Sequence, residues 1–195
     1  MKQITLKTLA LACLALCGSM AVRAETPKGW LAAGSHPKEY EMTLDRDLTH
    51  GGKSSASLKS IVSKASGFGT LMQMFKADDY RGKRLRLSGF VRSADVAEWA
   101  GLWLRVDGAK GEVLSFDNMQ SRAIKGTTGW IRYEVVLDVP ETSQQIAFGV
   151  LLSGTGQVWM DDMKFDTVGA DVPTTGSSER GGLKANAPVN LDFEE

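Results

Sequence analysis

Hydrophobic and polar residues alternate with a period of two over most of the chain, from Tyr40 to Val168. This alternation predicts half-buried β-strands, because successive side chains of a strand point to opposite faces. No long stretch has hydrophobic residues at the three- and four-residue spacing of a helix. The segments that alternate are EYEMTLD, SASLKSIVS, FGTLMQMFKA, KRLRLSGFVRSA, GLWLRVDG, EVLSFDN, WIRYEVVLDVP, QQIAFGVLLSG and GQVWMDDMKFDTV.

The alternation also predicts which side chains form the core. The positions expected on the core face are Leu85, Leu87, Val91, Leu102, Leu104, Val106, Ile131, Tyr133, Val135, Leu137, Val139, Ile146, Phe148, Val150, Leu152, Trp159, Met163 and Phe165. Glycine-containing turns such as YRGK, VDGAKGE, KGTTG and SGTGQ separate the strands. About eight or nine strands with one apolar face each predict an all-β fold, in which two antiparallel sheets pack face to face. The one helical turn expected is in Ser93–Gly101, with Ser93 as its cap.

The first 24 residues have the pattern of a signal peptide. Lys2 and Lys7 form a basic start, Thr8–Met20 is apolar, and Val22 and Ala24 are small residues before the expected cleavage site. The apolar run is too short for a spanning helix. A lipoprotein or an uncleaved anchor is the alternative, although Cys13 and Cys17 stand in poor lipobox contexts. We expect a periplasmic or secreted protein.

Removal of this segment changes the expected chemistry. Both cysteines lie in it, so the mature domain, expected over residues 25–168, has no disulfide and no cysteine metal site. Three of the 23 basic residues are also removed, which leaves the mature chain with a net charge of −3. This charge argues against nucleic acid and against an anionic membrane surface as partners.

After Val168 the alternation stops. Residues 169–189 are rich in Gly, Ser, Thr and Pro and are expected to form a flexible connector. Residues 190–195, NLDFEE, then resemble a short strand with Leu191 and Phe193 on one face. We expect this strand to dock on the sandwich; a tail without contacts and a strand donated to a second copy are the alternatives.

Several motifs, taken in order, resemble a known family. They are PKGW, GGKSSASL, YRGKRLRLSGFVR and GTGQVWMDDMKF. The chain resembles the galactose-binding-like jelly-roll domains, especially the carbohydrate-binding modules of xylanases and glucanases, over most of residues 29 to 168. The stretches GLWLRVDG, SFDNM, IKGTTGW and VLDVP resemble a subgroup of small bacterial jelly-roll proteins, some linked by name to transcriptional regulators. Here the sequence has no helix-turn-helix pattern, which argues against DNA binding.

The resemblance has two further implications. Such modules usually begin with a strand of the type N-x-x-F-E, which this chain lacks at the start and has at the end. A circular permutation is therefore expected, in which the C-terminal strand takes the place of the usual first strand. The resemblance also implies a structural calcium ion, held by Asp161 and Glu194 with backbone oxygens near Gly52 and Lys53.

Candidate ligand-binding residues lie on the strand faces opposite the predicted core and in nearby loops. Sugar rings stack on aromatic side chains while their hydroxyls bond to polar ones, so an outward tryptophan between arginines is a candidate platform. The candidates are Arg86, Trp99, Trp103, Arg105, Asp107, Asp117, Asn118 and Arg122. The alternative is that a loop or the arginine side chains cover Trp103 and make a second small core.

Catalytic motifs are missing from the sequence. His36 and His50 lack metal-ligand spacing, no G-x-S-x-G is present, and the adjacent acid pairs would point to opposite faces of a strand. We therefore expect an exported non-catalytic module that binds a carbohydrate or a related polar ligand. The alternative is a small envelope domain that binds another protein and has no affinity for sugar.

Overall fold

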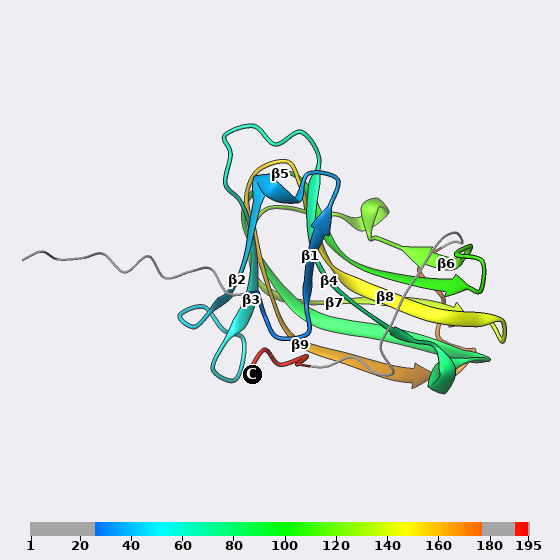
Figure 1. Ribbon diagram of the computed structural model, residues 1–195. Helices are drawn as coiled ribbons and strands as arrows, with labels where there is room; N and C mark the ends of the chain where they lie inside the picture. Colours follow the sequence, from blue (N-terminus) through cyan, green and yellow to red (C-terminus); the bar gives the residue numbers. More distant parts are fainter. Residues whose placement is uncertain (1–25, 177–189, 195) are drawn as a thin grey trace, which may run out of the picture.

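The protein is represented by a computed structural model that describes residues 26–176 and 190–194 (Figure 1). Within these ranges it contains strands and short 3-10 helices and no α-helix. The strands are β1 (Leu31–Gly34), β2 (Tyr40–Asp45), β3 (Ser55–Ser60), β4 (Phe68–Lys76), β5 (Lys83–Gly108), β6 (Val113–Asp117), β7 (Ile124–Val139), β8 (Ser143–Ser153) and β9 (Gln157–Val168). The 3-10 helices are η1 (Pro37–Glu39), η2 (Asp78–Tyr80) and η3 (Gln120–Arg122).

The long strand β5 connects the two layers of the sandwich. Its first half pairs with β7 and β9, and its second half pairs with β8 and β6. We call β1, β4, β8, the second half of β5 and β6 the first sheet, and β2, β3, β9, the first half of β5 and β7 the second sheet. All pairs are antiparallel, which confirms the predicted all-β sandwich.

The core lies between these two sheets. The predicted inward side chains of β5, which are Leu85, Leu87, Val91, Leu102, Leu104 and Val106, are all fully buried in one apolar cluster. Ile146, Phe148, Val150 and Leu152 of β8 join them from the first sheet. The alternation therefore predicted the core correctly along these strands, because each strand has one face in the core and one outside. Ile131 is an exception, since it is 44% exposed near the start of β7.

Strand β9 departs from the prediction at its centre. Val158 and Met160 point into the core, whereas Trp159 lies outside it and donates a hydrogen bond to Asp45 (2.8 Å). The register then shifts opposite Ser88 and Phe90, and Asp162 has a left-handed φ of 49°. This bulge adds one residue, so that Met163 returns to the core. The expectation that Trp159 and Met163 share a face is wrong because a strict period of two cannot anticipate a bulge.

The helical turn expected in Ser93–Gly101 is also absent, because β5 continues through this range. The Ser93 hydroxyl does not cap a helix: it bonds to the Gly126 carbonyl and the Thr128 hydroxyl of β7, at 3.0 Å each. Val96 is buried in the core, and repeated register shifts against β7 bend the strand from one sheet toward the other.

The C-terminal residues 190–194 pack against the sandwich without forming a strand. Phe193 is fully buried, with its ring 5.2 Å from that of Trp30. The Trp30 indole donates to the Asn190 carbonyl (3.1 Å), and the Met163 amide donates to the Leu191 carbonyl (3.1 Å). Left-handed φ values at Asn190 and Phe193 prevent the extended geometry that the sequence predicted. The predicted signal peptide and most of the predicted connector lie outside the described residues.

Candidate ligand-binding site

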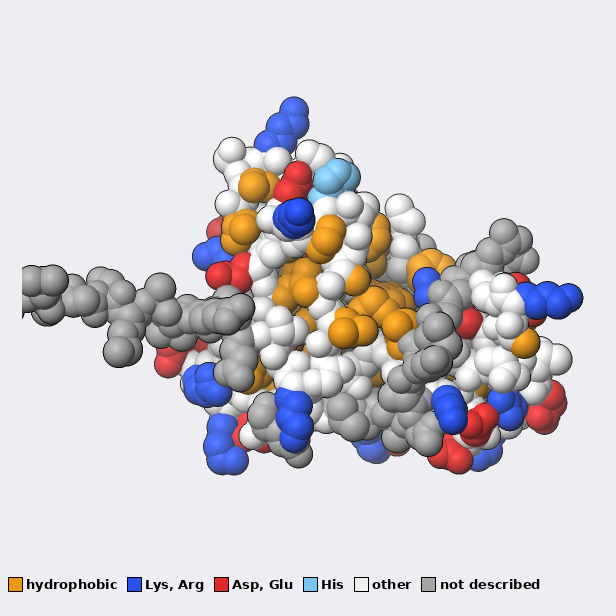
Figure 2. Space-filling model, in the orientation of Figure 1, with side chains coloured by type: hydrophobic (Ala, Val, Ile, Leu, Met, Phe, Trp, Pro, Cys, Tyr) orange, Lys and Arg blue, Asp and Glu red, His pale blue; other side chains and the backbone are white. Residues whose placement is uncertain are grey.

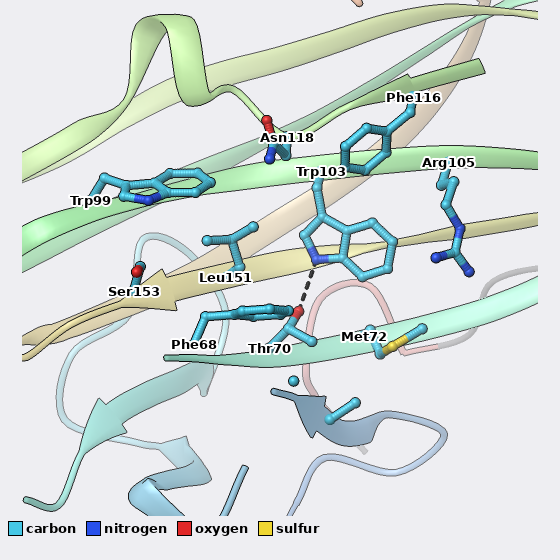
Figure 3. Close-up of a pocket in the computed structure, with 12 residues that line it drawn as sticks. Phe68, Thr70, Met72, Trp99, Trp103, Arg105, Phe116, Asn118, Leu151 and Ser153 are labelled. Carbon is cyan, nitrogen blue, oxygen red and sulfur yellow. Dashed lines mark hydrogen bonds between the residues drawn. The ribbon is translucent and has the colours of Figure 1, made fainter. Parts of the chain in front are cut away.

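A pocket of about 480 Å³ lies on the outer face of the first sheet (Figure 3). Four aromatic side chains form much of its wall, and Figure 2 shows hydrophobic side chains gathered in the middle of this face. The residues that line it are Ala33, Gly34, Phe68, Thr70, Met72, Trp99, Trp103, Arg105, Phe116, Asn118, Leu151 and Ser153.

Strand pairing brings these side chains into one surface. Ser153 of β8 lies between two aromatic residues of the neighbouring strands. It pairs with Phe68 of β4 on one side and with Trp99 of β5 on the other. On the other edge of β5, Arg105 stands opposite Phe116 of β6. Residues two apart on a strand share a face, so Trp99, Trp103 and Arg105 follow one another along the pocket.

Trp103 is held in place by its neighbours. Its side chain is only 7% exposed and packs with Ala147 and Leu151. Its indole nitrogen donates to the Thr70 hydroxyl (2.8 Å), which in turn donates to the Val150 carbonyl (2.7 Å). The ring therefore points outward from the sandwich, as predicted, but it also belongs to a second small core. Of the two alternatives offered by the sequence, the second small core is present, and the role of Trp103 as a sugar platform stays a prediction.

The loop after β6 brings Asn118 to the pocket. A Cβ atom at Gly101 would lie 2.8 Å from the Asn118 carbonyl oxygen, so glycine is what lets this loop pass close over β5. The adjacent Met119 is buried and has a left-handed φ of 62°. Figure 3 shows the Asn118 side chain on the same side of the pocket as Phe116.

The predicted residues Asp117 and Arg122 support this loop from beneath. The Asp117 carboxylate accepts a hydrogen bond from the Met119 amide (2.8 Å) and forms an ion pair with Arg122 (2.5 Å). Arg122 also donates to the Glu134 carbonyl (3.1 Å). Neither side chain lines the pocket.

Arg105 is the ionisable residue of the pocket wall. Its guanidinium pairs with the fully buried Asp107 (3.2 Å), which also accepts from Gln145 (3.3 Å). Asp107 therefore lies beneath the surface as the counter-ion of Arg105 and was wrongly expected to contact ligand directly. The guanidinium carbon lies 6.0 Å from the centre of the Trp103 ring.

Arg86 lies away from this pocket. It belongs to the first half of β5 and pairs with Asp166 (3.3 Å) and Glu134 (3.9 Å) on the second sheet. The prediction grouped it with Trp103 because both are outward on β5. Since β5 changes sheets between them, the two outward faces are on different sides of the sandwich.

Of the predicted candidates, Trp99, Trp103, Arg105 and Asn118 line the pocket. Sequence reasoning missed the other eight lining residues, which are Ala33, Gly34, Phe68, Thr70, Met72, Phe116, Leu151 and Ser153. The alternation in β4 and β8 would have placed Met72 and Leu151 opposite the core. What the sequence could not supply is the strand order, which puts β4, β8 and β5 side by side.

The two carboxylates expected to hold calcium are engaged by protein donors. Asp161 is buried and accepts hydrogen bonds from the amides of His50 (2.7 Å), Gly51 (3.3 Å) and Asp162 (2.8 Å). Burial raises the pKa of Asp161, and the amide hydrogen bonds offset this only in part. Within the described ranges, no group of three or more His, Cys, Asp or Glu residues could hold a metal ion.

Glu194 accepts from the amides of Lys53 and Ser54 and pairs with the Lys53 ammonium group (3.1 Å). The amide hydrogen bond from Lys53 is the main reason that the pKa of this carboxyl lies below its usual value. Amide hydrogens and an ammonium group are donors, whereas calcium needs oxygen ligands. The two carboxylates are therefore better suited to hold the loop between β2 and β3 than to form a complete set of calcium ligands. Calcium binding stays a prediction.

The pocket offers stacking surfaces and a few polar groups. Arg105 is the one ionisable residue among the twelve that line it, so the wall has no pair of an acid and a base. The arrangement suits binding of a ligand with both apolar faces and hydroxyl groups. It defines a jelly-roll β-sandwich with an aromatic pocket on one sheet, which is the architecture of many binding modules.

Solved structures share this fold. One is the CBM22-1 xylan-binding domain from Paenibacillus barcinonensis, which is 17% identical, covers 74% of this chain and 89% of that domain, and has a TM-score of 0.52. Another is the CBM22-1 and GH10 part of a Clostridium thermocellum endo-1,4-β-D-xylanase complexed with xylohexaose, with 15% identity, 75% and 27% coverage, and a TM-score of 0.52. The resemblance to galactose-binding-like jelly-roll domains is thus confirmed at the level of the fold.

The fold also occurs in an enzyme. The enzymatically active domain of tailspike protein 4 of bacteriophage CBA120 is 11% identical, with a TM-score of 0.56 over 72% of this chain and 20% of that chain. No protein-family model matches the chain.

One curated relative is similar in sequence. The uncharacterized HTH-type transcriptional regulator YbfP of Bacillus subtilis is 54% identical over 169 residues, which is 86% of this chain and 57% of the relative. The chain therefore spans a little over half of that protein. In the part of this chain that the structure describes, no α-helix is present that could form a helix-turn-helix, and no helix is long and apolar enough to cross a membrane.

Proposed function

We propose that the protein is an exported, non-catalytic module that binds a carbohydrate in the pocket of the first sheet. The observation that carries the proposal is Trp103, whose ring is fixed by Thr70 and Leu151 in the middle of an aromatic wall. A fixed ring loses little conformational freedom when a ligand binds, which favours affinity.

The pocket supplies both kinds of contact that a sugar needs. The aromatic rings of Phe68, Trp99, Trp103 and Phe116 offer flat apolar surfaces for the C–H faces of a sugar ring. Asn118, Ser153 and Arg105 stand around them as hydrogen-bond donors and acceptors for hydroxyl groups. The xylan-binding domain and the xylanase modules of the same fold make a β-1,4-linked glycan a reasonable first probe.

Two further parts of the proposal rest on sequence pattern and on chemistry. Export is supported by the basic start, the apolar run and the small residues before position 25. The non-catalytic character is supported by the pocket wall, because Arg105 is the one ionisable residue among the twelve described residues that line it. A mature net charge of −3 is unfavourable for binding to nucleic acid.

A glycan array followed by calorimetric titration tests the proposal. Trp99 is partly exposed at the pocket wall, and Trp99→Ala should weaken binding about tenfold through the loss of one stacking surface. Trp130→Ala is the matched control, because this partly exposed tryptophan of β7 lies on the second sheet, beside the His50 ring that stacks on Phe90. Equal losses in the two variants would contradict the proposed site.

A protein partner is the alternative occupant of this face. Leu31 and Phe68 are 50% and 37% exposed, and an exposed apolar group next to a pocket also suits a protein interface. Absence of any binding on the array, together with capture of a partner that Trp99→Ala abolishes, would favour this alternative.

A further inference from the structure

A second hollow of about 700 Å³ lies beside the aromatic pocket. It is lined by Phe116, Asp117, Asn118, Gln120, Ser121, Thr175 and Gly176. Phe116 and Asn118 line both hollows, so they form a shared wall. A linear ligand that leaves the aromatic pocket over Asn118 would therefore enter the second hollow.

The chemistry of the second hollow differs from that of the first. Gln120 and Ser121 are exposed, and neither side chain has a hydrogen-bond partner among the residues the structure describes. Phe116 is its one aromatic side chain. The aromatic pocket can thus stack sugar rings, while the second hollow can bond to hydroxyl groups.

The loop that carries these polar groups is held rigidly. The ion pair between Asp117 and Arg122 and the hydrogen bond from Arg122 to the Glu134 carbonyl join the loop to β7. The buried Met119 fixes its centre. The backbone of the loop that carries Gln120 and Ser121 is thus ordered before the ligand arrives, which lowers the entropic cost of binding.

Residues that follow β9 complete the far wall. The Thr175 amide donates to the Val136 carbonyl (2.8 Å), and its hydroxyl oxygen accepts from the Val136 amide (2.9 Å). A Cβ atom at Gly176 would clash with the Phe116 carbonyl oxygen, so the chain here lies directly against β6. This gives Thr175 and Gly176 a role, because they form one side of the hollow next to β6.

We infer that the second hollow is a polar subsite for further rings of a linear oligosaccharide whose first rings stack in the aromatic pocket. The inference rests on the proposed function. It assigns Gln120 and Ser121 to the recognition of hydroxyl groups and predicts that longer oligosaccharides bind more tightly than short ones. A ligand of one or two rings fills the aromatic pocket alone and gains nothing from the second hollow.

Calorimetric titration of the whole mature protein with β-1,4-linked xylo-, gluco- and manno-oligosaccharides of two and six rings tests this. We expect the six-ring member of a series that binds to bind at least fivefold more tightly than its two-ring member. Gln120→Ala/Ser121→Ala should remove most of this gain, about five- to tenfold, and leave the two-ring affinity unchanged. Gln144→Ala/Ser63→Ala is the matched control, since both of those residues are also exposed.

The outcomes separate the subsite from the proposed function. If the aromatic pocket binds the two-ring and six-ring ligands equally, or if the double variant retains the full gain, the second subsite is wrong while the module still binds sugar. If Trp99→Ala alone reduces all affinities and Ser121→Trp, which fills the hollow, changes none, the subsite is likewise wrong. If no oligosaccharide binds, the proposed function fails, and the inference fails with it.

Discussion

At the scale of single residues, Trp103 combines structural and ligand-binding roles. It lines the pocket, yet it is almost fully buried among Leu151, Ala147 and the neighbouring aromatic rings. Because the side chain is almost fully buried, its removal would leave a large cavity beside Thr70.

We therefore predict that Trp103→Ala lowers the free energy of unfolding by about 2–4 kcal/mol, a typical cost for truncating a buried aromatic side chain. Urea unfolding followed by circular dichroism measures this. Trp103→Phe keeps most of the packing and should lose less than half as much. A loss below about 0.5 kcal/mol for Trp103→Ala would show that the ring is not packed as described.

Phe193 is a second residue whose role depends on burial. Its ring is fully enclosed and contacts Trp30, although it lies in a segment that forms no regular strand. Phe193→Ala should destabilise the fold by about 3–5 kcal/mol. Asp192→Ala is the control, because the Asp192 side chain is exposed. If the two variants melt at the same temperature, the C-terminal segment does not dock in solution.

At the scale of elements, strand β5 decides how much the sequence could predict. The inward residues of its two halves were found from alternation, because both halves face the same core. Its outward residues could not be grouped correctly, since Arg86 and Trp103 lie on different sheets. The bulge in β9 also misleads a prediction from alternation. The residue added near Asp162 exchanges the inward and outward positions of the strand that follows. Alternation reports the face of each residue locally, whereas a site depends on which strands are neighbours.

Arg84 of β5, which joins β7 to the residues that follow β9, provides a prediction at this scale. Arg84 of β5 makes two hydrogen bonds to Asp138 of β7 (2.7 and 2.9 Å) and donates to the carbonyls of Ala170 (2.9 Å) and Val172 (2.6 Å). The Arg84 side chain holds the pKa of Asp138 below its usual value, and it does so more than burial raises it. A lowered pKa in the folded state means that the unfolded state binds more protons as the pH falls.

The ion pair should therefore contribute stability above the ordinary pKa of an aspartate, near 4, and lose it as the pH falls through the lower value of the folded state. We expect Asp138→Asn to lower the urea midpoint slightly at pH 7 and to have no effect near pH 2. The Asp138 side chain is 56% exposed, so the effect at pH 7 is small. If Asp138→Asn lowered the urea midpoint more near pH 2 than at pH 7, the expected direction of the pH dependence would be wrong.

At the scale of the whole molecule, the chain folds into a sandwich whose two outer faces differ. The first sheet carries the aromatic pocket, whereas the second sheet carries charged pairs such as Arg86 with Asp166 and Lys164 with Asp166. The loop between β2 and β3 joins the second sheet to the C-terminal segment. Its amides bond to Asp161 and Glu194, so one loop clamps both elements.

This clamp leads to a prediction about metal. Because amide donors and Lys53 already satisfy these carboxylates, we expect chelation of calcium to shift the melting temperature by less than about 1 °C. Differential scanning calorimetry with EDTA and then with millimolar calcium measures the shift. A rise of several degrees with calcium, lost in Asp161→Asn and Glu194→Gln, would establish the calcium site that the resemblance implies.

The central claim is that ligand binds to the first sheet at Trp99 and Trp103. The protein has five tryptophans, and each indole N–H gives its own signal in a nitrogen–proton NMR correlation spectrum. Titration with the six-ring oligosaccharide that binds best should shift the signals of Trp99 and Trp103. The signals of Trp30, Trp130 and Trp159 should stay in place. Shifts confined to Trp130 and Trp159, on the second sheet, would contradict the proposed site.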